Sequence, residues 1–240
     1  STQVTELSGM GSAVLGEVSI SRCRFSNVNT GLSMALPTHN IRIENSIFDG
    51  YANNGISITK SGNAPTELLL QFNTVILPAG NAGDGVEIGI VPGATPFAKA
   101  RLYNTVINGN IRDLNIGGQT LIARYNLWNT QSFVEGASLD PASGNNRTGD
   151  PGITAFRPIE PTSQLINNGI NYIASQPNVD FGGGTRLVGT RPDIGAFESS
   201  VDNASTLTVT STADSGAGSL RAAIITANTN PATKKIVFNI

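Results

Sequence analysis

The sequence has little charge, few aromatic residues and no long hydrophobic run. Charged residues make up 13% of the chain, and a net charge of -2 arises from scattered acids and bases, without the basic stripe of a nucleic-acid-binding protein. No apolar run approaches the length of roughly 18 residues that a membrane-spanning helix needs. With 4 Tyr and 1 Trp, the chain also has few aromatic side chains for an exposed carbohydrate-binding face.

Cysteine and histidine each occur once. Cys23 can form no disulfide within the chain, and we interpret it as a small buried apolar side chain in the asparagine column described below rather than a nucleophile. His39 has no Cys or second His with which to build a metal site. We therefore expect no metal and no cofactor, and calcium would enter only together with a lyase-type activity.

The sequence does contain a repeat. Four asparagines, each after a short apolar run, recur at intervals of 22 to 31 residues, and they are Asn45, Asn73, Asn104 and Asn126. Downstream of each turn, a strip such as 55–59 or 85–90 alternates apolar with small or polar residues. This alternation is typical of short strands with one buried face, and such a repeat indicates a solenoid.

Stacked coils would place equivalent residues about 4.8 Å apart along the axis. The four asparagines would then form one hydrogen-bonded ladder at a tight bend. Two apolar columns would stack inside, one of Leu32, Ile56, Val86 and Leu114 and one of Met34, Ile58, Ile88 and Ile116. The pattern predicts an all-β fold, a right-handed parallel β-helix, and it resembles the pectin-lyase-like superfamily.

Residues 149–198 carry a second set of motifs. An Asp150-Pro151 loop, the segment Leu-Ile-Asn-Asn-Gly ending at Gly169 and the segment Pro-Asp-Ile-Gly-Ala-Phe-Glu ending at Glu198 follow in that order. The order resembles the C-terminal end of bacterial secreted β-helix proteins of the choice-of-anchor and related surface families.

We expect these motifs to close the solenoid. Ile194 and Phe197 would seal the core of the last coil, while Asp193 and Glu198 would bind backbone amides or Arg191. A catalytic role for this carboxylate pair is the less favoured interpretation.

The remaining segment has a different character. We interpret residues 201–204 as a polar linker after a β-helix of residues 1–200. In residues 205–240, strands at 207–210 and 235–240 flank a short helix at 219–228, with Ser219 as its N-cap and Leu220, Ala223, Ile224 and Ala227 on one face. The stretch Gly-Ser-Leu-Arg-Ala-Ala-Ile at 218–224 resembles the capping helix that opens a β-helix in the same families.

A cap-like segment at the C-terminal side indicates assembly. Residues 1–20 contain no amphipathic helix that could cap their own coil, so the chain is either a window cut from a tandem array or a subunit whose cap serves the next copy. We expect Leu220 and Ile224 to cover the first coil of a following copy, and the strand with Ile236 and Phe238 to pair with it.

One outward patch could carry chemistry. The alignment brings Asn54, Asp84 and Arg112 into one row and Ser57, Glu87 and Asn115 into another, with Asp113 beside them. Asp84, Glu87, Arg112 and Asp113 are therefore the candidate catalytic residues of a polysaccharide lyase or glycoside hydrolase acting on acidic polysaccharide. The competing interpretation is an ordinary solvated face.

We favour a structural role over an enzymatic one. The chain is expected to be an extracellular or cell-surface module of an adhesin, sheath or fibre, joined head-to-tail to further copies of itself, with surface carbohydrate as a second candidate partner.

Overall fold

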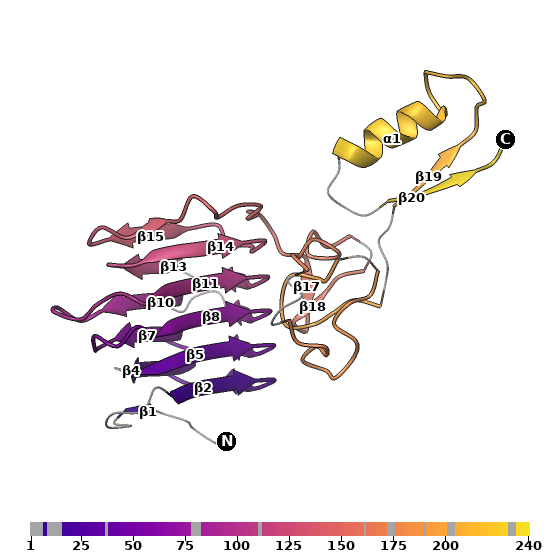
Figure 1. The fold of residues 1–240 in the computed structure, drawn as a ribbon. Coiled ribbons are helices and arrows are strands. Elements are labelled where there is room, and N and C mark those ends of the chain that lie inside the picture. Colours follow the sequence, from indigo (N-terminus) through magenta and orange to yellow (C-terminus); the bar gives the residue numbers. More distant parts are fainter. Residues whose placement is uncertain are drawn as a thin grey trace.

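The chain folds as a parallel β-helix, as predicted, with one short α-helix near the C-terminus (Figure 1). The coils wind in the right-handed sense expected of parallel crossovers. The computed structural model describes residues 7–8, 16–36, 38–77, 83–109, 112–160, 162–171, 176–189, 191–200, 205–229 and 234–240.

Three parallel sheets form the walls of the solenoid. Sheet 1 consists of β1 (Leu7–Ser8), β4 (Leu32–Leu36), β7 (Asn54–Lys60), β10 (Asp84–Ile90), β13 (Arg112–Gly117) and β15 (Gln131–Val134). Sheet 2 consists of β2 (Gly16–Ser21), β5 (His39–Glu44), β8 (Glu67–Gln71), β11 (Lys99–Tyr103), β14 (Thr120–Arg124) and β16 (Ser138–Leu139). Sheet 3 consists of β3 (Arg24–Ser26), β6 (Ile47–Asp49), β9 (Thr74–Ile76) and β12 (Val106–Asn108).

The predicted apolar columns of sheet 1 are confirmed. β7 pairs with β4 and β10 so that Ile56 faces Leu32 and Val86, and Ile58 faces Met34 and Ile88. Alternate residues of each strand point into the coil, and all of these side chains are buried. A matching column from sheet 2 completes the core with Ile20, Ile43, Leu70, Leu102 and Ala123.

One residue per coil turns the corner between sheets 2 and 3. At six equivalent positions φ lies between 48° and 57°, the left-handed region that L-residues other than Asn rarely adopt. We call this set the corner column, and number the coils by its members, which are Arg22, Asn45, Phe72, Asn104, Tyr125 and Asn145 in coils 1 to 6.

The predicted single ladder of Asn45, Asn73, Asn104 and Asn126 is wrong. β6 pairs with β9 so that Ile47 faces Thr74, and Asn73 therefore lies beside Ser46 rather than Asn45. Asn45 and Asn104 belong to the corner column, whereas Asn73 and Asn126 come one position later. Cys23 shares the later position in coil 1, but it is exposed rather than buried as predicted.

The later position holds neighbouring coils together. The Asn73 side-chain oxygen accepts a hydrogen bond from the Ser46 amide at 3.0 Å, and the Asn126 oxygen accepts one from the Thr105 amide at 2.9 Å. The Asn126 side-chain nitrogen also donates to the Leu102 carbonyl at 2.8 Å. Each of these buried amides therefore bonds to the backbone of the preceding coil.

Residues 149–200 turn away from the stack after its last coil. A hairpin of β17 (Ile153–Thr154) and β18 (Arg157–Pro158) begins the segment, and Figure 1 shows its loops beside the ends of the sheet 2 strands. Its described residues cover the outer face of sheet 3. Its apolar residues pack there in two clusters, one of Val106, Leu127, Leu165 and Ile194 and one of Ile47, Ala196 and Phe197. The expectation that Ile194 and Phe197 seal the last coil is therefore wrong, because both cover the side of the solenoid.

Residues 205–240 form a separate small unit. β19 (Ser205–Val209) and β20 (Lys234–Phe238) pair in parallel, α1 (Leu220–Thr229) connects them, and Figure 1 shows the unit standing away from the stacked coils. The predicted linker 201–204 lies outside the described residues. The Ala222 amide donates to the Ser219 hydroxyl at 3.2 Å, which confirms Ser219 as the N-cap.

The predicted face of α1 is buried only in part. Ala223 is buried, whereas Leu220 and Ile224, which are expected to cover a following copy, are exposed. In the part of the chain that the structure describes, no helix is long and apolar enough to cross a membrane.

The asparagine after the corner can be tested by substitution. Asn126→Leu leaves the Thr105 amide and the Leu102 carbonyl without their partner, and we expect it to lower the free energy of unfolding by about 1–3 kcal/mol. The measurement is chemical denaturation. Asn53→Leu, at an exposed asparagine, is the control and should change the value by no more than about 0.5 kcal/mol. Equal effects at both sites would show that Asn126 does not hold the coils.

Candidate functional site

The predicted alignment of the outward patch on sheet 1 is confirmed. Asp84 faces Asn54 and Arg112 on the neighbouring strands, and Glu87 faces Ser57 and Asn115. The candidates thus come from β10 and β13, which are consecutive strands of one sheet.

Asp84 is bonded to its neighbours through both carboxylate oxygens. The Arg112 guanidinium donates to them at 3.0 and 2.9 Å, and the Asn115 side chain adds a bond of 3.1 Å. The bidentate contact with Asp84 raises the pKa of Arg112. A carboxylate fixed in this way stabilises the sheet and is poorly placed to abstract a proton.

Glu87 makes its own set of contacts. One of its oxygens accepts bonds from the Asn54 side chain at 2.7 Å and from the Ser57 hydroxyl at 2.9 Å. Glu87 therefore links β10 to β7, just as Asp84 links β10 to β13, and the two carboxylates face different partners.

Asp113 is buried, as Asp84 is, but it has different partners. Its side chain accepts hydrogen bonds from the amides of Gly109 at 2.6 Å, Thr130 at 3.0 Å and Asn129. The residue that pairs with Asp113 in the preceding coil is Gly85, where a Cβ would lie 2.2 Å from the Ile107 side chain. Asp113 therefore holds a backbone turn, whereas Asp84 and Glu87 bond to side chains of neighbouring strands.

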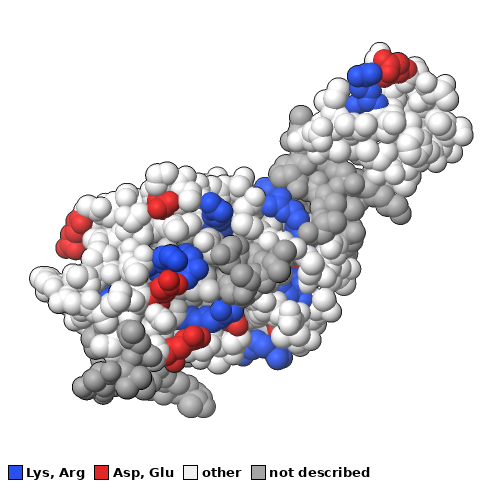
Figure 2. Space-filling view, in the orientation of Figure 1, with Lys and Arg blue, Asp and Glu red and all other residues white. Residues whose placement is uncertain are grey.

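The outer face of sheet 2 carries charges of both signs. Figure 2 shows basic and acidic side chains alternating over this face, and the contacts include the ion pairs of Arg42 with Glu44 and of Arg101 with Glu67. Neighbouring charges of opposite sign compensate each other, so the face presents no strong field to a charged polymer.

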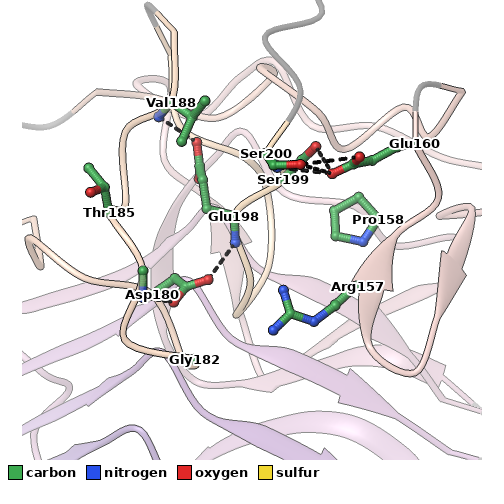
Figure 3. A pocket seen from close by; sticks show the side chains of 11 residues that line it. Arg157, Pro158, Glu160, Asp180, Gly182, Thr185, Val188, Glu198, Ser199 and Ser200 are labelled. Carbon is green, nitrogen blue, oxygen red and sulfur yellow. Dashed lines mark hydrogen bonds between the residues drawn. The ribbon is translucent and has the colours of Figure 1, made fainter.

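A second group of carboxylates lines a pocket of about 420 Å³ among the C-terminal loops (Figure 3). β18 supplies Arg157, the following loop supplies Glu160, the glycine-rich turn supplies Asp180, and the end of the segment supplies Glu198. Sequence reasoning named Glu198 but missed Asp180 and Glu160, because nothing in their spacing indicates that these loops meet.

These carboxylates bind the backbone of the loops. Glu198 accepts bonds from the amides of Val188 at 3.1 Å and Asp193 at 2.9 Å. Asp180 accepts one from the Glu198 amide at 3.1 Å, as Figure 3 shows, and another from Gly184 at 2.8 Å. The expectation that Glu198 takes up backbone donors is confirmed.

Arg186 is the cation beside this group. It is fully buried, and its guanidinium donates to the Asn45 side-chain oxygen at 2.5 Å and to the carbonyls of Gly195 and Ala196 at 3.1 and 2.5 Å. Its nearest approach to Glu198 is 3.6 Å. Burial lowers the pKa of Arg186 to about 10, so it stays charged at neutral pH.

Of the two alternatives expected for Asp193 and Glu198, the structure has the backbone amides and not Arg191. Arg191 lies with its guanidinium carbon 4.7 Å from the centre of the Tyr125 ring and donates to the Gly169 carbonyl at 3.0 Å. Arg186 occupies the position beside the carboxylates.

Burial dominates the proton affinity of the two carboxylates. Loss of hydration is the largest cause that raises the pKa of Glu198 to about 8 and that of Asp193 to about 6, and the charge of Asp193 contributes to the rise at Glu198. Two amides, from Asn167 and Ser199, donate to Asp193 at 2.7 Å each and oppose its shift. Perturbed carboxyls often mark active sites, but here each one holds backbone amides.

Among the described residues, no group of three or more His, Cys, Asp and Glu side chains is arranged to hold a metal ion. Comparison with known proteins gives no match to a protein family, to a curated protein or to a solved structure.

The raised pKa values predict a pH dependence of stability. The ordinary values are 3.8 for Asp and 4.5 for Glu, so the folded state binds more protons than the unfolded state between about pH 4 and pH 8. The protonation of these two groups therefore contributes fully to the free energy of unfolding below about pH 4, and this contribution is lost as the pH rises to about 8.

Denaturant unfolding between pH 6 and 8 covers the range in which Glu198 contributes most. We expect the free energy of unfolding to fall over this range in the wild type, and Glu198→Gln to flatten the slope although it lowers stability throughout. A slope that survives the substitution would assign the pH dependence to other groups.

Proposed function

We propose that the chain is a structural β-helix module of an extracellular or cell-surface fibre, sheath or adhesin, in which residues 205–240 join one copy to the next. The motifs at 149–198 and 218–224, which resemble those of bacterial secreted β-helix proteins, support this reading. Surface carbohydrate is a further candidate partner.

The observation that carries the proposal is the exposed apolar surface of the C-terminal unit. Leu220, Ile224 and Ile225 of α1 are 42%, 44% and 57% exposed, and Phe238 of β20 is 60% exposed. The helix residues line a groove of about 530 Å³ between α1 and the turn at 212–214. Burying a large aliphatic or aromatic side chain is worth about 1.5–3 kcal/mol, so a partner that covers this surface gains substantially.

The first complete coil offers a matching surface. Its inward residues Val18, Ile20 and Phe25 are only partly buried, although their partners in the next coil are fully buried. β2 also ends its sheet, so one of its edges has no paired strand among the described residues.

The geometry of the unit suits strand addition. β19 and β20 pair in parallel, as all strands of the three sheets do, so β20 can continue the stack of a second copy from the β2 edge while α1 covers the core. The two surfaces differ, and a contact of this heterologous kind propagates as a filament unless it closes into a ring.

Association tests the proposal. We expect Ile224→Asp to abolish self-association of the full chain, measured by light scattering and electron microscopy, because it places a charge in the apolar contact. Ile159→Asp, at an exposed isoleucine of the C-terminal loops, is the matched control and should associate normally. Truncation after Ser200 should also abolish self-association. Assembly that survives the truncation would show that residues 205–240 do not form the joint.

A polysaccharide lyase or hydrolase is the alternative. The bonds of Asp84 to Arg112 and of Glu87 to Asn54 favour the structural role, so we expect no reducing ends and no unsaturated products from a panel of acidic polysaccharides, with or without calcium. Turnover that Asp84→Ala abolishes would overturn the structural role.

A further inference from the structure

The coils of a simple solenoid contact only their neighbours. Its end coils can therefore fray one at a time, and its stability is a sum of nearest-neighbour terms. The sheets of this chain follow that rule, since each strand pairs only with the strands of the coils before and after it.

The C-terminal segment breaks the rule. We use the name strap for residues 162–171, 176–189 and 191–200, which lie along the corner column. Five successive corner residues contact the strap. Three donate hydrogen bonds to its carbonyls: Arg22 to Phe181 at 3.4 Å, Asn45 to Val179 at 2.7 Å and Asn104 to Ile170 at 2.9 Å. The other two, Phe72 and Tyr125, have ring centres 4.5 and 4.7 Å from the guanidinium carbons of Arg186 and Arg191.

Backbone contacts run beside these side chains. The Gly195 amide donates to the Asn104 carbonyl at 2.8 Å in coil 4, and the Ala196 amide donates to the Thr74 hydroxyl at 2.9 Å in coil 3. Gly195 has φ of +110° and lies so close to the sheet that a Cβ would be 3.0 Å from the Thr74 hydroxyl, so a side chain there would strain the contact.

We propose that the strap is a clasp that makes coils 1 to 5 unfold as one cooperative unit, with Arg186 as its positioning residue. A coil at either end of this stretch then separates only when its contact with the strap also breaks. The clasp needs no partner copy, so its failure in a test would leave the head-to-tail contact untouched.

Arg186 is central because it bonds to both sides of the contact. It reaches Asn45 of coil 2 and covers Phe72 of coil 3, while it also holds two carbonyls of the strap itself. Removing the guanidinium takes a donor from the Asn45 oxygen and from both carbonyls, of which Ala196 keeps only the Phe181 amide, and this loss should release the strap before the sheets separate.

Native-state hydrogen exchange of the full chain, read strand by strand, tests the clasp. In the wild type we expect the amides of β5, β8, β11 and β14 to open with equilibrium constants within about threefold of one another, as in one cooperative unit. In Arg186→Met the constants should spread by about tenfold or more, with the end strands opening most readily.

Two further variants complete the design. Arg112→Met removes an ion pair between adjacent coils and should cause no gradient of the opening constants along the stack. Thr74→Val removes a single strap bond, should fold in any case, and should produce a smaller gradient of the same kind. The proposal would be overturned if the opening constants of the wild type already differed from strand to strand in this way. It would also be overturned if the constants stayed uniform in both Arg186→Met and Thr74→Val.

Discussion

The left-handed backbone turn in the corner column is the constraint on which the rest of the structure depends. Each coil turns from sheet 2 to sheet 3 at one residue there, at a cost of about 1–2 kcal/mol wherever the residue is not Gly, Asn or Asp. Arg22, Phe72 and Tyr125 nevertheless occupy the position. The turn directs the next residue inward, where Asn73 and Asn126 bond to the neighbouring coil.

The same turn directs the corner side chains outward, and their contacts with the strap offset its cost. Polar members accept or donate hydrogen bonds, and aromatic members lie beneath an arginine. This explains why such different residues share one backbone conformation. It also explains the glutamate and aspartate in the loops above, since Asp180, Asp193 and Glu198 fold the strap into the shape that reaches the corner.

The sequence predicted the regular part of the fold and failed at the contacts between distant segments. Period-two alternation identified the inward columns and aligned Asp84 with Arg112, because the strand pairing follows from which face is buried. Asparagine spacing failed because Asn suits both the left-handed turn and the inward position after it, and loops of variable length hide a shift of one residue. Arg186 stands one residue beyond a run of three glycines and has no periodic signal, so its contact with Asn45, 141 residues away, could not be read from the chain.

Polar chemistry in this chain is therefore directed at its own backbone and at neighbouring coils, which agrees with a scaffold. The most exposed large apolar side chains, Ile225, Phe238 and Ile240, lie on the C-terminal unit, whereas Val91, Val134, Ile159 and Leu187 are exposed singly elsewhere. The solenoid and strap would supply a rigid body, and the unit beyond would supply the joint.

A double-mutant cycle between Asn45 and Arg186 tests most directly whether the corner column holds the strap. Asn45→Ala, Arg186→Met and the combined variant are compared by the free energy of unfolding. The structure predicts a coupling free energy of about 1 kcal/mol or more, because the two side chains bond directly at 2.5 Å. Additive effects, within about 0.5 kcal/mol, would contradict the account.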